Sequence, residues 1–168
     1  MKTLRNIAAG SIVAAILFFM QACGVGAQVP KKEKQNAVKS MVDSKDYVFK
    51  ADYVIPMRGT SRSLTSDYDL AVSKDTVKAY LPFFGRAYTA PIDPTQGGIK
   101  FTSTDFNYQT KEKKKGGWQV TIELKDADDV RQLMLDISEN GYASLRVTSN
   151  NREAISFNGY IKERSIRK

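Results

Sequence analysis

Apolar and polar residues alternate along most of the chain after residue 46, and this period of two is typical of half-buried β-strands. The clearest run is 118–124, in which every second residue from Trp118 to Leu124 is apolar. In the first run the odd-numbered residues from Tyr47 through Tyr53 to Ile55 are expected to share one face. The pattern offers candidate strands at 47–55, 68–72, 76–80, 99–104, 106–111, 118–124, 130–137, 143–148 and 155–161.

The run 130–137 also fits the apolar face of a helix, but we predict a strand because Asn140-Gly141 follows it as a hairpin turn would. Asn150-Asn151 provides a second turn signal before the last strand. Short strands separated by turns predict a mostly β domain (α+β class). We expect a curved antiparallel sheet or barrel-like meander of about seven or eight strands.

One segment before the strands has helical spacing instead. Between residues 33 and 44, Val38, Met41 and Val42 recur on one side with Ala37 beside them. The narrow apolar stripe predicts one N-terminal amphipathic helix, which covers one face or one end of the sheet.

The first 27 residues have the order of a bacterial signal peptide: Lys2 and Arg5, then an uncharged apolar stretch from 7 to 20, then small residues. Two processing sites remain open. Cleavage after Ala27 would remove 1–27, whereas a lipoprotein signal of 1–22 would leave Cys23 as a lipidated first residue. A basic tether at 28–34 and a single β-rich domain at 35–168 are expected to follow.

Composition limits the chemistry. The chain has a net charge of +8, no histidine and one cysteine, and removal of the leader would leave about +6. Ser-His-Asp, Cys-His and histidine-based zinc sites are therefore excluded, and an intramolecular disulfide is excluded as well. Net charge of this size favours solubility, and the basic turn at 111–115 is expected to serve the same purpose rather than nucleic-acid binding.

Several sequence stretches taken together resemble a known family. They are Tyr68-Asp69-Leu70, YLPFFGRAY at 80–88, GGIKF at 97–101, and NGYASLRVTSNNREAISFNGYI at 140–161. In this order they resemble the exported-protein family of Bacteroidota known as domain of unknown function 4251. The resemblance implies export and a β-rich fold over nearly all of the mature chain, and it implies no catalytic residues.

The densest acidic cluster is Asp126, Asp128 and Asp129, which we interpret as a solvated turn, with a calcium site as the weaker alternative because the spacing departs from a calcium-binding loop. No cofactor and no metal are predicted. A hydrolase that uses two carboxylates from distant strands stays an alternative.

The segment 80–88 is the candidate binding site, because it concentrates Tyr80, Phe83, Phe84, Arg86 and Tyr88 around a proline and a glycine. Its structural alternative is a loop that closes one end of the sheet. Arg152 is expected to pair with a nearby acid or with backbone.

The leading functional hypothesis is a non-enzymatic binding module for a small apolar or amphipathic ligand, or for an envelope protein partner. The alternative is a structural or inhibitory envelope protein that acts through its surface. The expected location is the periplasm or, through Cys23, the membrane of a Gram-negative envelope.

Overall fold

The structure is a computed structural model that describes residues 31–88 and 97–164. The predicted leader, Cys23 and both cleavage sites lie outside the described residues. The described chain forms one helix and ten strands. They are α2 (Lys31–Ser44), β1 (Tyr47–Pro56), β2 (Arg62–Ser63), β3 (Asp69–Val72), β4 (Val77–Leu81), β5 (Ile99–Ser103), β6 (Phe106–Glu112), β7 (Trp118–Leu124), β8 (Val130–Ile137), β9 (Tyr142–Ser149) and β10 (Ile155–Lys162).

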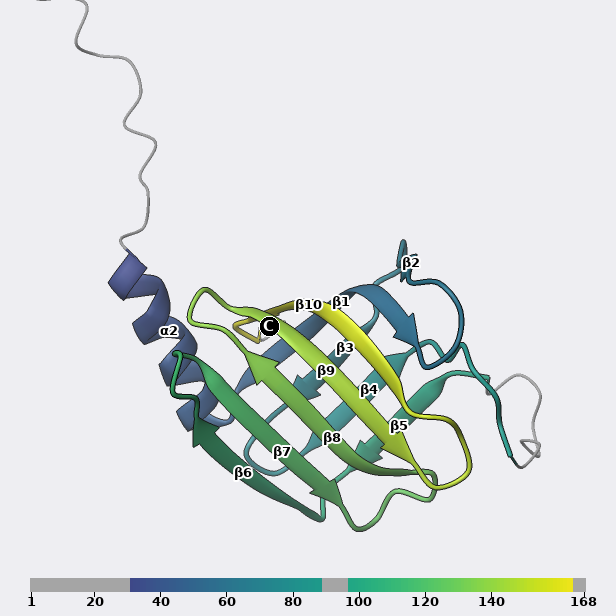
Figure 1. The fold of residues 1–168 in the computed structure, drawn as a ribbon. Helices are drawn as coiled ribbons and strands as arrows, with labels where there is room; N and C mark the ends of the chain where they lie inside the picture. Colours follow the sequence, from purple (N-terminus) through teal and green to yellow (C-terminus); the bar gives the residue numbers. More distant parts are fainter. Residues whose placement is uncertain (1–30, 89–96, 165–168) are drawn as a thin grey trace, which may run out of the picture. The chain divides into compact units, whose positions relative to one another are not determined.

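All neighbouring strands in the sheet are antiparallel, in the order β5-β4-β3-β1-β10-β9-β8-β7-β6, with the short β2 beside β1 (Figure 1). The first and last strands of the chain, β1 and β10, therefore pair at the centre of the order. The two ends of the order, β5 and β6, follow each other in the sequence without pairing. The predicted curved, barrel-like meander is confirmed, and it is nearly closed, with one open seam between β5 and β6.

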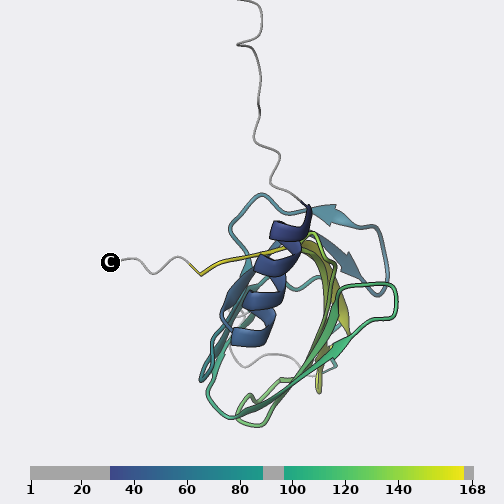
Figure 2. The same cartoon turned by 90° about the vertical axis from the view of Figure 1, so that its left-hand side faces the viewer.

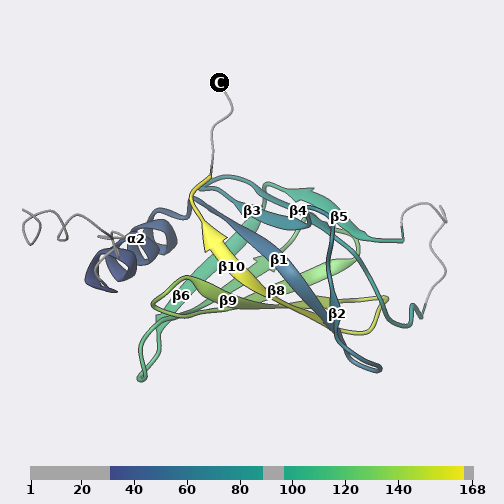
Figure 3. The same ribbon diagram turned by 90° about the horizontal axis from the view of Figure 1, so that it is seen from above.

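The curved sheet encloses a filled interior. Strands β3, β4 and β5 form one layer and β6 to β9 the other, and β1 and β10 join the two layers (Figure 3). Large side chains from both layers are fully buried, among them Phe49, Leu70, Leu135 and Phe157. Burial of each such side chain contributes about 1.5–3 kcal/mol, so the packing of the two layers holds the sheet in its curved form.

Helix α2 covers the end of the sheet where β6 and β8 end and β9 begins (Figure 2). Its apolar stripe is buried through Val38 and Val42, and the Tyr108 hydroxyl on β6 donates to the Val42 carbonyl at 3.1 Å. The helix begins at Lys31, inside the range 28–34 that the sequence analysis assigns to a tether. Residues 31–34 form the first turn of the helix. The carboxylate of Glu33 in this turn is favoured by the positive end of the helix dipole. No helix in the described residues is long and apolar enough to cross a membrane.

Strand β1 corrects one sequence prediction. Tyr47, Phe49 and Ala51 point inward as expected, but Tyr53 and Ile55 are exposed. The pairing of β1 with β10 shifts between Ala51 and Tyr53, where Asp52 is an extra residue. This β-bulge puts Asp52 and Tyr53 together on the outward face and returns Val54 to the core.

Candidate functional site

The segment 82–88 lies along the turn between β9 and β10, at the opposite end of the strands from α2. Backbone pairing holds it there: the Tyr88 amide donates to the Asn151 carbonyl at 2.8 Å, and the Glu153 amide donates to the Arg86 carbonyl at 3.0 Å. Ala87 and Arg152 form an isolated antiparallel bridge. The segment therefore extends the sheet beyond β10 and helps to close this end of the barrel.

The five residues predicted from the sequence lie in different surroundings. Phe83 and Phe84 are partly buried against the core, whereas Arg86 and Tyr88 are exposed. Tyr80 projects from the outward face of β4, where its ring stacks on Tyr68 with centroids 5.5 Å apart. The packing of Phe83 and Phe84 against the core fits the interpretation of this segment as a loop that closes one end of the sheet.

Two residues that the sequence analysis did not treat as a site, Arg152 and Glu153, hold the segment in place. The guanidinium of Arg152 lies 5.2 Å from the ring centre of Phe83, and its NH1 donates to the Gly98 carbonyl at 3.1 Å. The carboxylate of Glu153 is buried and accepts the Arg86 amide at 3.3 Å. Pairing of Arg152 with an acid and with backbone is confirmed, since its Nε lies 2.9 Å from Asp129 Oδ2.

A hollow of about 340 Å³ lies between β5 and the β7–β8 turn, close to the open seam; we call it the seam hollow. Arg152 lines it and connects it to Phe83. Its wall combines apolar side chains with charged and hydroxyl-bearing ones. The lining residues are Gly98, Ile99, Lys100, Phe101, Thr102, Asp126, Ala127, Asp128, Asp129, Val130 and Arg152.

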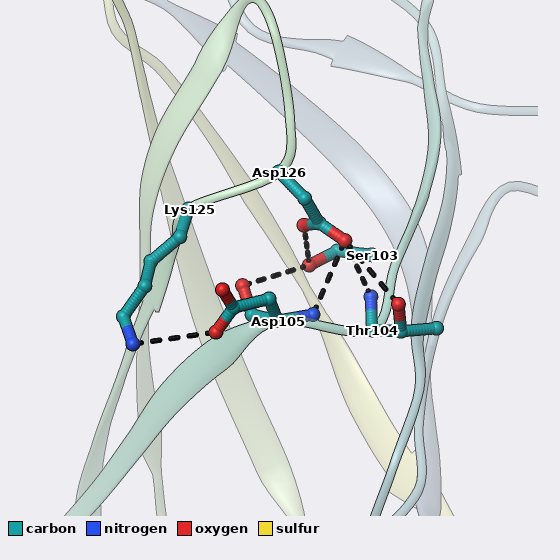
Figure 4. Close-up of polar contacts among 5 residues, drawn as sticks. All are labelled: Ser103, Thr104, Asp105, Lys125 and Asp126. Carbon is teal, nitrogen blue, oxygen red and sulfur yellow. Dashed lines mark hydrogen bonds and ion pairs between the residues drawn. The ribbon is translucent and has the colours of Figure 1, made fainter.

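Asp126 forms one wall of the seam hollow and ties the β7–β8 turn to the β5–β6 turn (Figure 4). The buried Ser103 hydroxyl donates to Asp126 Oδ1, and the amides of Thr104 and Asp105 donate to Oδ2 at 2.8 and 3.1 Å. The Ser103 hydroxyl, followed by the Thr104 amide, lowers the pKa of this carboxyl to about 2. Asp126 thus fastens the seam where no strand pairing does so.

Replacing Asp126 tests this role. Asp126→Asn is expected to lower the thermal midpoint at pH 6 by a few degrees, because an amide cannot accept as strongly from three donors. The folded pKa of about 2 lies below the unfolded value of 3.8, so the carboxylate contributes stability above about pH 3.8 and loses it as the pH falls through 2. The difference between wild type and Asp126→Asn should therefore shrink from pH 4 to pH 2, and Asp128→Asn serves as the control. A constant difference over this range would contradict the role.

In the same wall, one carboxylate oxygen of Asp129 has no hydrogen-bond partner among the described residues. Its Oδ2 pairs with Arg152, while Oδ1 is buried and has no hydrogen-bond partner among the described residues. A buried acceptor without a donor costs about 1–3 kcal/mol, so a donor group from a bound molecule would be favourable here. Within the described residues, no group of three or more acidic, cysteine or histidine side chains is arranged to hold a metal ion.

These features define the class: a small mostly β domain with one helix and a nearly closed antiparallel sheet that is fastened at its seam by side chains. The chain belongs to the family described as Domain of unknown function (DUF4251), which it matches over residues 30–161. The resemblance found in the sequence is confirmed.

Among the solved structures similar to this chain is a DUF4251 family protein from Bacteroides eggerthii DSM 20697, with a TM-score of 0.58. The two are 14% identical, and the match covers 77% of this chain and 87% of the other. At this identity the likeness shows the fold alone. No curated protein matches the chain.

Proposed function

We propose that this protein is a non-enzymatic binding module that holds a small amphipathic ligand in the seam hollow. The observation that carries the proposal is the lining of this 340 Å³ hollow, in which Ile99, Phe101 and Val130 stand beside Lys100 and Asp129. The wall of the hollow is mostly polar, with a smaller apolar part, and placed polar groups of this kind orient a ligand in a concave site. The many buried apolar side chains in the interior of the barrel direct the proposal to this surface hollow rather than to the core.

The wall indicates the chemistry of the ligand. An apolar part of the ligand would lie against the half-buried Phe101 and Ala127, and a hydroxyl or ammonium group would donate to the exposed carboxylate of Asp128. Lys100 would favour an acceptor group near the outer rim, although its ammonium also lies 5.0 Å from the ring centre of Tyr80. A small molecule with one donor, one acceptor and an apolar body matches these positions.

The state of the carboxylates supports binding rather than hydrolysis. A two-carboxylate hydrolase needs two acids that are free to act, about 5 to 10 Å apart. Asp126 accepts from Ser103 and two turn amides, and Asp129 is paired with Arg152. The absence of histidine from the sequence removes the most common general base as well.

Filling the seam hollow tests the proposal. Wild-type protein, purified without denaturation from the envelope of its own host type, is expected to carry a small molecule detectable by native mass spectrometry. Ala127→Trp, which places an indole in the hollow, should abolish the added mass, whereas Ala71→Trp on the outward face of β3 should retain it. Wild-type protein without added mass, or Ala127→Trp with the same added mass, would overturn the proposal.

We further propose that the module acts in the cell envelope after export. The support is the order of charge, apolar stretch and small residues in 1–27. Intact mass spectrometry of the mature protein distinguishes its two forms: acylated Cys23 as first residue means a membrane-anchored lipoprotein, and unmodified Gln28 means a free periplasmic domain. A mature protein that starts at Met1 would contradict export.

A further inference from the structure

A second concave surface lies on the outward face of β1, β10 and β9, three strands that are adjacent in the sheet (Figure 1). It has a volume of about 440 Å³ and lies beside Tyr53 of β1 and Tyr142 of β9; we call it the tyrosine groove. The two phenol side chains are 53% and 65% exposed. Ser144 and Asn158, which pair directly across β9 and β10, form its floor.

The β-bulge in β1 creates this groove. In a regular strand Asp52 and Tyr53 would point to opposite faces, but the extra residue turns both outward, and both line the groove. The bulge brings the Lys50 carbonyl so close to Gly159 of β10 that no side chain fits at that position. Bulges of this kind re-aim side chains and are common beside functional sites. The fold therefore presents an aromatic ring and a carboxylate together at one groove.

The spacing of the rings suits an extended ligand. Tyr53 pairs with Asn158, and Asn158 pairs with Ser144, which is two residues from Tyr142 along β9. Two strand spacings of about 4.8 Å and a two-residue offset along the strand separate the backbones of the two tyrosines by roughly 12 Å. The floor between them offers a hydroxyl from Ser144 and an amide from Asn158 that both donates and accepts. A ligand that spans the groove thus meets an apolar ring at each end and paired hydrogen-bonding groups between them.

The charged residues that line the groove limit the class of ligand that it can bind. The groove is lined by Asp52 and Asp136 and by no lysine or arginine, so an anionic ligand is disfavoured. A cationic ligand would compete with Lys113, whose ammonium already lies 3.2 Å from Asp136 Oδ1. The Asn158 amide also has donor groups that an ammonium cannot use. Carboxylates, amides and hydroxyls between flat aromatic rings match a neutral ligand with many hydroxyl groups.

We propose that the tyrosine groove binds a neutral oligosaccharide, whose flat C–H faces stack on Tyr53 and Tyr142 while its hydroxyls pair with Asp52, Ser144 and Asn158. This site is independent of the seam hollow and goes beyond the proposed function. The shallow, open shape of the groove fits the side of a sugar chain, which needs no enclosed pocket.

A microarray of neutral and acidic oligosaccharides, probed with the folded protein, tests the proposal. Wild type is expected to bind neutral oligosaccharides, and the binding should persist in 0.5 M salt because no charge pairing carries it. Tyr53→Ala and Tyr142→Ala should each weaken binding about tenfold or more, since exposed aromatic anchors dominate such contacts. Tyr142→Phe, which keeps the ring, should bind nearly as wild type does.

Tyr88→Ala is the matched control, because Tyr88 is an even more exposed tyrosine outside the groove. It should bind as wild type does, and Ala127→Trp should do the same, which separates this site from the seam hollow. Circular dichroism should show that all variants are folded. Failure of wild type to bind any neutral oligosaccharide, binding to acidic glycans alone that salt removes, or full binding by Tyr53→Ala and Tyr142→Ala would overturn the proposal.

Discussion

Gly159→Ala is expected to destabilise the protein by about 3 kcal/mol or more, because among the glycines that the structure describes this one has the closest neighbouring atom to an added methyl group. A Cβ at this position would overlap the Lys50 carbonyl oxygen and approach the Cα of Ala51. Both are backbone atoms of the bulged strand β1, so no side chain can rotate to relieve the overlap. The pairing of β1 with β10, which joins the two layers of the sheet, would have to shift.

Urea denaturation at constant pH measures this effect as a change in the free energy of unfolding. Gly97→Ala is the matched control, because a Cβ at Gly97 meets no atom within 4 Å. The control should stay within about 1 kcal/mol of wild type. Equal stability of the two variants would show that β1 and β10 can separate at the bulge without cost.

Arg152→Ala is expected to cost about 2–4 kcal/mol. The guanidinium, whose side chain is 14% exposed, pairs with Asp129 at 2.9 Å and donates to the Gly98 carbonyl. Its removal leaves the partly buried Asp129 carboxylate without a partner. It also removes the cation above the Phe83 ring, so that the segment 82–88 is held to the β9–β10 turn only by its backbone pairing and by Glu153.

Arg152→Lys should recover less than half of the loss, because an ammonium cannot reach the Asp129 carboxylate and the Gly98 carbonyl with the geometry of a planar fork. Thermal and urea unfolding of both variants provide the measurement, with the exposed Arg146→Ala as control. Limited proteolysis should show faster cleavage near 82–98 in Arg152→Ala than in wild type. If Arg152→Ala were as stable as wild type, Arg152 would not be the residue that anchors this end of the barrel.

The strands could be predicted because their signals are local. Alternation in 118–124 and the turn at Asn140-Gly141 predict β7 and the β8–β9 hairpin from neighbouring residues alone, and the strand choice for 130–137 is confirmed. The two-residue strand β2 is missing from the prediction because it is too short to show a period. The predicted helix starts at 33, two residues late, because Lys31 and Lys32 add nothing to the apolar stripe.

The candidate sites show where local reasoning ends. The composition of 80–88 marks it as unusual, but the position of Phe83 under Arg152 depends on contacts between residues far apart in the chain. The outward direction of Tyr53 depends on a bulge that only the pairing with β10 reveals. The roles of Asp126 and Gly159 have no signal in the sequence. Asp126 accepts from Ser103, and Gly159 lies against the Lys50 carbonyl, and both partners are distant in sequence.

The sequence by itself determined the β-rich class, the single amphipathic helix, the family and the exclusion of histidine and disulfide chemistry, because periodicity, composition and motif order are properties of the chain alone. Only the tertiary structure decided which side chains meet. It separated Tyr80 from Phe83, placed Arg152 between Asp129 and the aromatic segment, and formed the seam hollow and the tyrosine groove. The reason is physical: a site is set by strand register and sheet curvature, which arise from the packing of two layers and not from any one segment.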